Sequence, residues 1–328
     1  MSFLMLRATD FATSEKLFVR ERFSLIPADA PKDFATQLKG AALNAFDLTF
    51  NGRGIGWNWG KGIYVPPSSG PVTPRGPMDF LVGFVKTQTF FDFVLFAQQS
   101  WELSPSKYPT HRHGGSIFSP DLPPFLRYGK VASLTFICAL ALYTSFQATY
   151  YGVGFVAMTV FRQVGEQWPP LFQAPWEVTS LGEYWGLRWH QVFKRAFIIC
   201  GAKPTARLFG RTGGVLGAFF VSGLMHDFGV WGAGIGTELS SVTLFFTMMG
   251  VGCILEVIWR EKTGFKVGGP VGWLWSMVWL FFWGSFIVDA WARRGLVTTK
   301  TSEDNTRPSV YWVKVVQRWV ELHGQPFE

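Results

Sequence analysis

Apolar residues in this chain occur in long blocks separated by polar, charged segments. Four blocks, residues 131–161, 212–232, 239–259 and 271–291, are each long enough for a helix that crosses a bilayer, which takes about 20 residues. A fifth block, residues 80–97, is interrupted by charged and polar side chains, so we expect it to span with help from neighbours or to lie in the interface. The pattern predicts an all-α polytopic transmembrane helical bundle with about five spans and additional interfacial helices.

The region before the first block contains no convincing membrane helix. It begins with a charged stretch that can form a helix and continues with a Gly- and Pro-rich stretch at residues 52–77, where these residues break regular structure. We expect a surface loop there, with Trp57 and Trp59 as candidate anchors at a membrane interface.

The chain ends with a second type of apolar pattern. In VYWVKVVQRWVEL, Trp312, Val315 and Trp319 fall on one helical face, which predicts an interfacial amphipathic helix. We therefore divide the chain into a charged and Gly/Pro-rich region (1–78), a transmembrane domain (79–295) and an amphipathic tail (296–328).

Composition agrees with a membrane protein. Of the 328 residues, 48% are hydrophobic and only 16% are charged, below the roughly 25% usual in globular proteins. The net charge of +8 comes from Lys and Arg spread through the connecting segments. This distribution favours contacts with anionic membrane lipids and argues against nucleic-acid binding, which needs a clustered basic patch. The three Cys lack metal-binding spacing, and His111 and His113 have no third ligand nearby, so we expect no metal site.

The block at 212–232 places His226 and Asp227 inside an apolar helix, where a charge costs at least about 2.5 to 3.5 kcal/mol. One interpretation is a structural hydrogen bond to another helix. The other is chemistry, because a buried imidazole stays neutral and can accept a proton as a general base. Ser222 lies four residues earlier on the face of His226. Asp227 points about 100° away, so we expect its partner on another helix.

A basic segment before this block, SLGEYWGLRWHQVFKR at 180–195, predicts a short helix. Ser180 and Glu183 have the spacing of a capping box. In a regular helix Trp185 and Trp189 would stack on one face, and Glu183 and His190 would share nearly the same face. Positive charge for an anionic substrate would come from Arg188, Lys194 and Arg195.

Three stretches resemble signature segments of a known family. RGIGWNWG at 53–60, EYWGLRWHQVFKR at 183–195 and SGLMHD at 222–227 are similar, in sequence and order, to those of the fungal wax-synthase-like branch of the membrane-bound O-acyltransferase family. The resemblance extends over roughly residues 40 to 295. It implies a multi-helix protein of the endoplasmic reticulum that binds no cofactor and uses acyl-CoA as co-substrate to acylate a lipophilic alcohol.

The resemblance also implies roles for individual residues. His226 would be the catalytic base, and His190 a second polar site residue where relatives often have Asn. Trp185, Arg188 and Trp189 would shape the acyl-CoA end of the site, and Asp227 stands where relatives often have Glu. Relatives have several spans before RGIGW that are not recognisable here, which indicates a truncated gene model or a reduced variant.

Three alternatives to an acyltransferase remain open on the sequence. A transporter could use His226 and Asp227 as a polar relay, although the internal repeats expected of it are not found. A membrane enzyme such as a terpene cyclase could stabilise carbocations with its many aromatic residues. The third alternative is a non-catalytic remnant.

Overall fold

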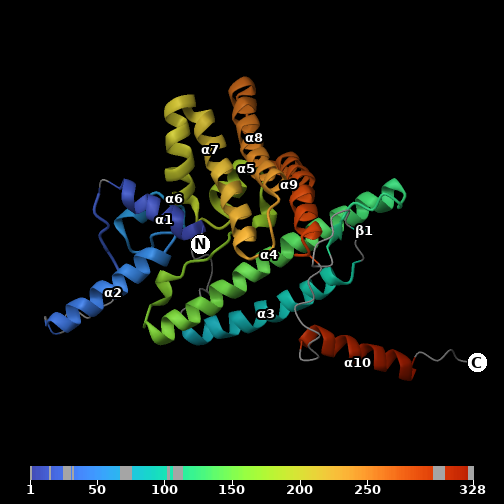
Figure 1. Cartoon of the computed structure of the whole chain (residues 1–328), viewed down its shortest axis with the longest axis horizontal. Helices are drawn as coiled ribbons and strands as arrows, with labels where there is room; N and C mark the ends of the chain where they lie inside the picture. The colour runs from blue at the N-terminus through green and yellow to red at the C-terminus, as the bar shows by residue number, and fades with distance from the viewer. Residues whose placement is uncertain are drawn as a thin grey trace, which may run out of the picture. The chain divides into compact units, whose positions relative to one another are not determined.

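The computed structural model describes residues 2–14, 16–24, 31, 33–66, 76–101, 104–105, 114–297 and 307–323. Within these residues the chain is mostly helical, with almost no strand (Figure 1). Five helical stretches are long and apolar enough to cross a membrane: α3 (Pro77–Gln99), α4 (Pro124–Val160), the stretch Lys194–Gly232, α8 (Leu239–Thr263) and α9 (Gly269–Arg293). They contain the five apolar blocks almost in full, so the predicted fold class is confirmed.

Shorter elements connect or flank these spans, or form the start of the stretch Lys194–Gly232. The α-helices among them are α1 (Ser2–Thr13), α2 (Phe34–Phe50), α5 (Leu181–Glu183), α6 (Lys194–Phe197) and α10 (Pro308–His323). The 3-10 turns are η1 (Asn58–Gly60), η2 (Gly165–Gln167) and η3 (Pro175–Glu177), and two π-helical turns are η4 (Tyr184–Arg188) and η5 (Ile198–Ala202). The two short strands β1 (Ser104–Pro105) and β2 (Gly115–Ser116) pair antiparallel.

The chain forms two compact units, each built from segments far apart in sequence. The first unit combines residues 1–77 with residues 154–284, and the second combines residues 78–153 with residues 285–328. Every candidate site residue identified from the sequence belongs to the first unit. The three-part division by sequence, at 1–78, 79–295 and 296–328, stays a prediction about functional segments.

In the first unit, the stretch Lys194–Gly232 folds back on itself instead of forming one straight helix. α7 (Lys203–Gly232) is broken at Phe209 and Gly210, where Gly210 has a φ of +66° that an L side chain rarely adopts. The chain reverses there, so that Gly201 of η5 packs directly on the backbone of Gly217. Figure 1 shows this hairpin in yellow beside the orange α8. The straight part after the break, residues 211–232, corresponds to the predicted span at 212–232.

The N-terminal part of the first unit differs from the expected surface loop. Trp57 and Trp59 are only 6% and 7% exposed. The indole N–H of Trp57 donates to Asp47 on α2 over 2.7 Å, and the guanidinium of Arg20 lies over the same ring. The two indoles therefore anchor residues 53–60 inside the protein, and the expectation that they insert into a membrane interface is wrong. The apolar pattern also did not predict α2. This helix begins after Asp33, whose side chain accepts the Thr36 N–H.

In the second unit, the contacts of Asp92 explain why a charged residue interrupts the apolar block at residues 80–97. Its carboxylate on α3 accepts from Arg307 Nε over 2.6 Å and from the Ser309 N–H over 2.7 Å. This carboxylate therefore holds the start of α10, which forms where the tail helix was predicted. The unit's apolar core is built around Ile117 and Leu134. His111 and His113 lie outside the described residues.

Candidate functional site

His226 is held in one tautomer by its own helix. Its Nδ1 lies 2.7 Å from the backbone carbonyl oxygen of Ser222, one turn earlier in α7. A carbonyl oxygen only accepts, so Nδ1 carries the proton and donates it. The lone pair of the neutral ring is then on Nε2. Ser222 thus meets His226 through its backbone, on the face where the sequence placed it.

A phenyl ring from the next helix supports the imidazole. Phe246 of α8 stacks on His226 with centroids 4.3 Å apart and 26° between the planes. The two helices approach closely because Gly223 faces the backbone of Thr243, where a Cβ on residue 223 would lie 2.8 Å from the Thr243 Cα. The small residues around His226 therefore allow α8 to cover one face of the ring.

Asp227 lies beside His226 but has a different partner. Its side chain is buried, and Oδ1 accepts the backbone N–H of Glu238 over 2.8 Å. Glu238 immediately precedes α8, so this carboxylate caps the start of the helix that carries Phe246. The expectation that Asp227 faces another helix agrees with this geometry, which gives Asp227 a supporting position.

The segment 180–195 begins as predicted but then leaves the regular helix. Ser180 Oγ accepts the Glu183 N–H over 3.1 Å, whereas the Glu183 carboxylate accepts the N–H of Thr179 and not that of Ser180. The helix widens into the π-turn η4 and ends at Arg188, and Trp189 is extended. The prediction that Glu183 and His190 share a helical face is therefore wrong, because the helix does not reach His190.

An aromatic cluster connects this segment to His226. The Trp185 ring contacts Phe246 at a centroid distance of 6.1 Å, so Trp185 and His226 both pack on the same phenyl ring. Trp189 stacks on Tyr184 at 5.5 Å and meets Trp185 edge-on at 6.4 Å, so the predicted stack of the two indoles is replaced by a T-shaped contact. The Trp185 Nε1–H is buried without a hydrogen-bond partner among the described residues.

His190 lies in an apolar environment next to this cluster. Its ring contacts those of Phe172, Trp189 and Phe193. The pKa of His190 is lowered from 6.5 to about 3, first by burial and then by electrostatic interaction with His226 and Arg53. His190 is therefore neutral at neutral pH and near enough to His226 for an electrostatic interaction.

The three candidate phosphate-binding cations make contacts inside the protein. Arg188 Nε pairs with Glu183 over 2.7 Å, Arg195 Nε pairs with Asp10 over 2.8 Å, and Lys194 Nζ donates to the Gly186 carbonyl over 3.0 Å. These contacts hold the segment in place and join it to α1. A role for these cations toward CoA phosphates stays a prediction, and it requires the present contacts to be shared or exchanged.

Several residues that shape the site were not singled out from the sequence. Arg53 donates to the carbonyl oxygens of Pro169 and Pro170, over 2.9 and 2.7 Å. It thereby attaches the first motif, RGIGWNWG at 53–60, to the chain that precedes the second motif, EYWGLRWHQVFKR at 183–195. Gln191 Nε2 donates to the carbonyl oxygens of Trp185 and Trp189 and closes the turn after η4. A third such residue is Glu256, a charged residue inside the apolar block 239–259 of α8. The sequence could have indicated this one, because charges within spans are costly.

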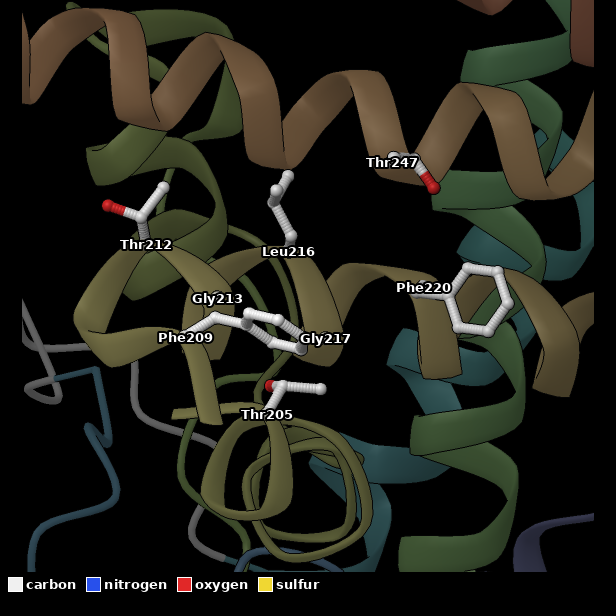
Figure 2. Close-up of a pocket in the computed structure, with 8 residues that line it drawn as sticks. All are labelled: Thr205, Phe209, Thr212, Gly213, Leu216, Gly217, Phe220 and Thr247. Carbon is white, nitrogen blue, oxygen red and sulfur yellow. The ribbon is translucent and has the colours of Figure 1, made fainter. Parts of the chain in front are cut away.

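Two further features lie outside this cluster. An apolar cavity of about 480 Å³ opens between the hairpin and α8, lined by residues from Thr205 to Phe220 and by Thr247 (Figure 2). It includes none of the predicted site residues. Among the described residues, no group of three or more His, Cys, Asp or Glu side chains could hold a metal ion.

Comparison with known proteins shows a family to which this part of the chain is similar. Residues 168–248, which include both histidines, match the model of the membrane bound O-acyl transferase family. The chain is 30% identical to the acetyltransferase aurG of Calcarisporium arbuscula over 44% of its length and 39% of that protein. It is 27% identical to the O-Mevalon transferase macI of Penicillium terrestre over 74% of its length and 58% of that protein.

A plant protein is also among the similar proteins. The long-chain-alcohol O-fatty-acyltransferase of Simmondsia chinensis is 27% identical over 46% of the chain and 42% of that protein. The matches thus span less than two thirds of each of these relatives. No solved structure matches. With five helices able to cross a membrane, the chain is an integral membrane protein, and its residues 168–248 match the model of the membrane bound O-acyl transferase family, which confirms the family resemblance identified from its sequence.

Proposed function

We propose that this protein transfers an acyl group from acyl-CoA to the hydroxyl of a lipophilic alcohol, in the membrane of the endoplasmic reticulum, with His226 as general base. The observation that carries the proposal is the hydrogen bond from His226 Nδ1 to the Ser222 carbonyl. It leaves Nε2 as the proton acceptor on a helix that is long and apolar enough to cross a membrane. The names of the relatives, which describe acetyl transfer and fatty-acyl transfer to a long-chain alcohol, support the reaction class.

The proposed reaction is a direct transfer. His226 Nε2 takes the proton of the alcohol while the alcohol oxygen attacks the thioester carbonyl carbon. The carbon–sulfur bond then breaks, the new ester leaves, and the CoA thiolate takes the proton from the imidazolium. No metal or bound cofactor is required by these steps.

Other residues of the cluster have proposed supporting roles. A neutral His190 can donate a hydrogen bond to the thioester carbonyl oxygen, where negative charge develops. The Trp185 Nε1–H is a second donor in the same aromatic cluster. Lys194 and Arg195 would face the CoA phosphates, while Arg188 keeps the second motif in shape through Glu183. Asp227 and Ser222 hold the elements around His226.

The proposal is tested by expressing the chain in yeast microsomes and measuring acyl transfer. Acetyl-CoA and longer acyl-CoAs are offered as donors, with a panel of long-chain, terpenoid and sterol-like alcohols as acceptors. We expect ester formation that is lost in His226→Gln and kept in Phe220→Leu, a change of an exposed residue on the same helix. Full activity of His226→Gln would exclude His226 as the base.

The same assay separates the other function classes. Solute flux coupled to protons in proteoliposomes, without ester formation, would indicate a transporter. Product formation without any CoA donor would indicate a cyclase-type enzyme. Fractionation of the tagged protein in the same cells tests the endoplasmic-reticulum location.

A further inference from the structure

Glu256 of α8 contacts the chain directly before the second motif at 183–195. Its Oε1 accepts the backbone N–H of Leu181 over 2.6 Å, and its Oε2 accepts that of Gly182 over 2.9 Å. These are the first two residues of α5, whose N–H groups have no partner within the helix. A carboxylate is the strongest side-chain acceptor for such groups, because charge-assisted hydrogen bonds are about twice as strong as neutral ones.

A third donor to the carboxylate comes from another helix. Trp275 Nε1 of α9 donates to Glu256 Oε1 over 3.0 Å. The next indole on that helix, Trp279, stacks near Trp275 at 4.8 Å and donates to the Met248 carbonyl of α8 over 3.0 Å. Trp275 and Trp279 of α9 therefore hold α8 and orient Glu256. This arrangement compensates for the cost of a carboxylate inside a span.

The contact with Leu181 is also steric. Leu181 is fully buried, and its side chain fills the space above Gly252, one turn before Glu256 on α8. Four residues after Leu181 comes Trp185, which packs on Phe246, also of α8. The segment is thus fixed to α8 at two points, one polar at Glu256 and one aromatic at Phe246.

We infer that Glu256 is a positioning residue, which fixes the register of the segment 181–190 against α8 and thereby places Trp185 and His190 relative to His226. This inference rests on the proposed function for its effect on catalysis, but the placement itself does not depend on it. Phe246 of α8 packs on His226, and Glu256 of α8 binds the start of the segment that carries His190. Both histidine-bearing segments are therefore positioned against the same helix.

The placement is tested by hydrogen exchange of the full-length protein in detergent. In Glu256→Ala we expect the peptide containing Leu181 and Gly182 to exchange faster, with peptides of α7 and α8 unchanged. Glu256→Gln keeps one acceptor oxygen and should give an intermediate rate. Glu261→Gln, an exposed acid five residues later on the same helix, is the matched control and should equal wild type. Unchanged exchange at Leu181 and Gly182 in Glu256→Ala would overturn the inference.

A second arm measures catalysis on the same variants. Misplacement of a catalytic group by about 1 Å can reduce rates roughly 100-fold, so we expect Glu256→Ala to lower kcat by about this factor with a smaller change in the KM for acyl-CoA. Glu256→Gln should recover part of the loss, and Trp275→Phe should cost less than Glu256→Ala. A rate loss that Glu256→Gln does not reduce, with wild-type exchange at 181–182, would overturn the positioning role. If wild type itself shows no transfer, the proposed function fails, while the exchange arm still decides the placement.

Discussion

The imidazole of His226 lies stacked on the phenyl ring of Phe246, with centroids 4.3 Å apart and 26° between the planes. The hydrogen bond to the Ser222 carbonyl fixes the rotation of the imidazole, and Phe246 covers one of its faces. The same phenyl ring contacts Trp185. Phe246 therefore links the helix of the proposed base to the second motif.

Phe246→Leu is expected to slow acyl transfer while preserving the fold. The leucine keeps an apolar side chain but loses the ring stacking, which is worth about 0.5 to 1.5 kcal/mol, so we expect a decrease of roughly 2- to 10-fold in kcat/KM. The measurement is the microsomal transfer assay at matched expression. Phe220→Leu on α7 is the control, and an equal decrease in both variants would contradict a specific role for Phe246.

Asp227→Ala is expected to destabilise the protein through the start of α8. It removes the acceptor for the Glu238 N–H, and loss of such a cap costs about 1 kcal/mol. Asp227→Asn keeps an oxygen at the same place and should retain most of the stability. Thermal unfolding of the purified protein in detergent measures both. Equal losses in the two variants would show that the charge of Asp227 matters more than its capping oxygen.

Stability is expected to fall in acid because of His190. Its pKa is about 3 in the folded protein against 6.5 for an unperturbed histidine, through burial first and then through His226 and Arg53. Between these values the unfolded chain binds more protons, so the stabilising contribution is complete above about pH 6.5 and declines as the pH falls toward 3. Unfolding midpoints of wild type and His190→Gln between pH 7 and pH 4 test this. The variant should lose less stability over this range, and equal slopes would contradict the assignment.

Asp10→Asn is expected to be strongly destabilising. Asp10 is fully buried and pairs with Arg7 and Arg195, each over 2.8 Å, so the neutral amide would leave two guanidinium groups without a counter-charge. Breaking a buried pair costs about 3 to 5 kcal/mol. Glu21→Gln removes the partner of Lys61 in a pair whose side chains are 40% and 71% exposed, and should change stability little. Similar unfolding midpoints for both variants would contradict this account.

Much of the fold follows from the sequence because membrane spans obey a local rule. A run of about 20 apolar residues must form a helix in hydrocarbon, where backbone groups have no water to bind, so the five spans and their approximate ends were predictable. Ionisable groups in such helices are costly, and this likewise indicated His226 and Asp227 as candidate site residues. The motif RGIGWNWG could be identified in the sequence. The prediction that its two indoles lie at a membrane interface was wrong, because an amphipathic Trp side chain suits both an interface and a protein interior.

Only the tertiary structure decided what each polar group contacts. The π-turn at Tyr184–Arg188, which removes His190 from the face of Glu183, depends on packing of Trp185 against α8 and on the amide bonds to Glu256. The pairing of Asp10 with Arg195 joins residues 185 positions apart, a distance that no local pattern encodes. The sequence by itself determined which segments are helical and which residues carry chemistry. Their mutual placement came from long-range contacts, since hydrogen bonds and ring packing are set by how the helices meet.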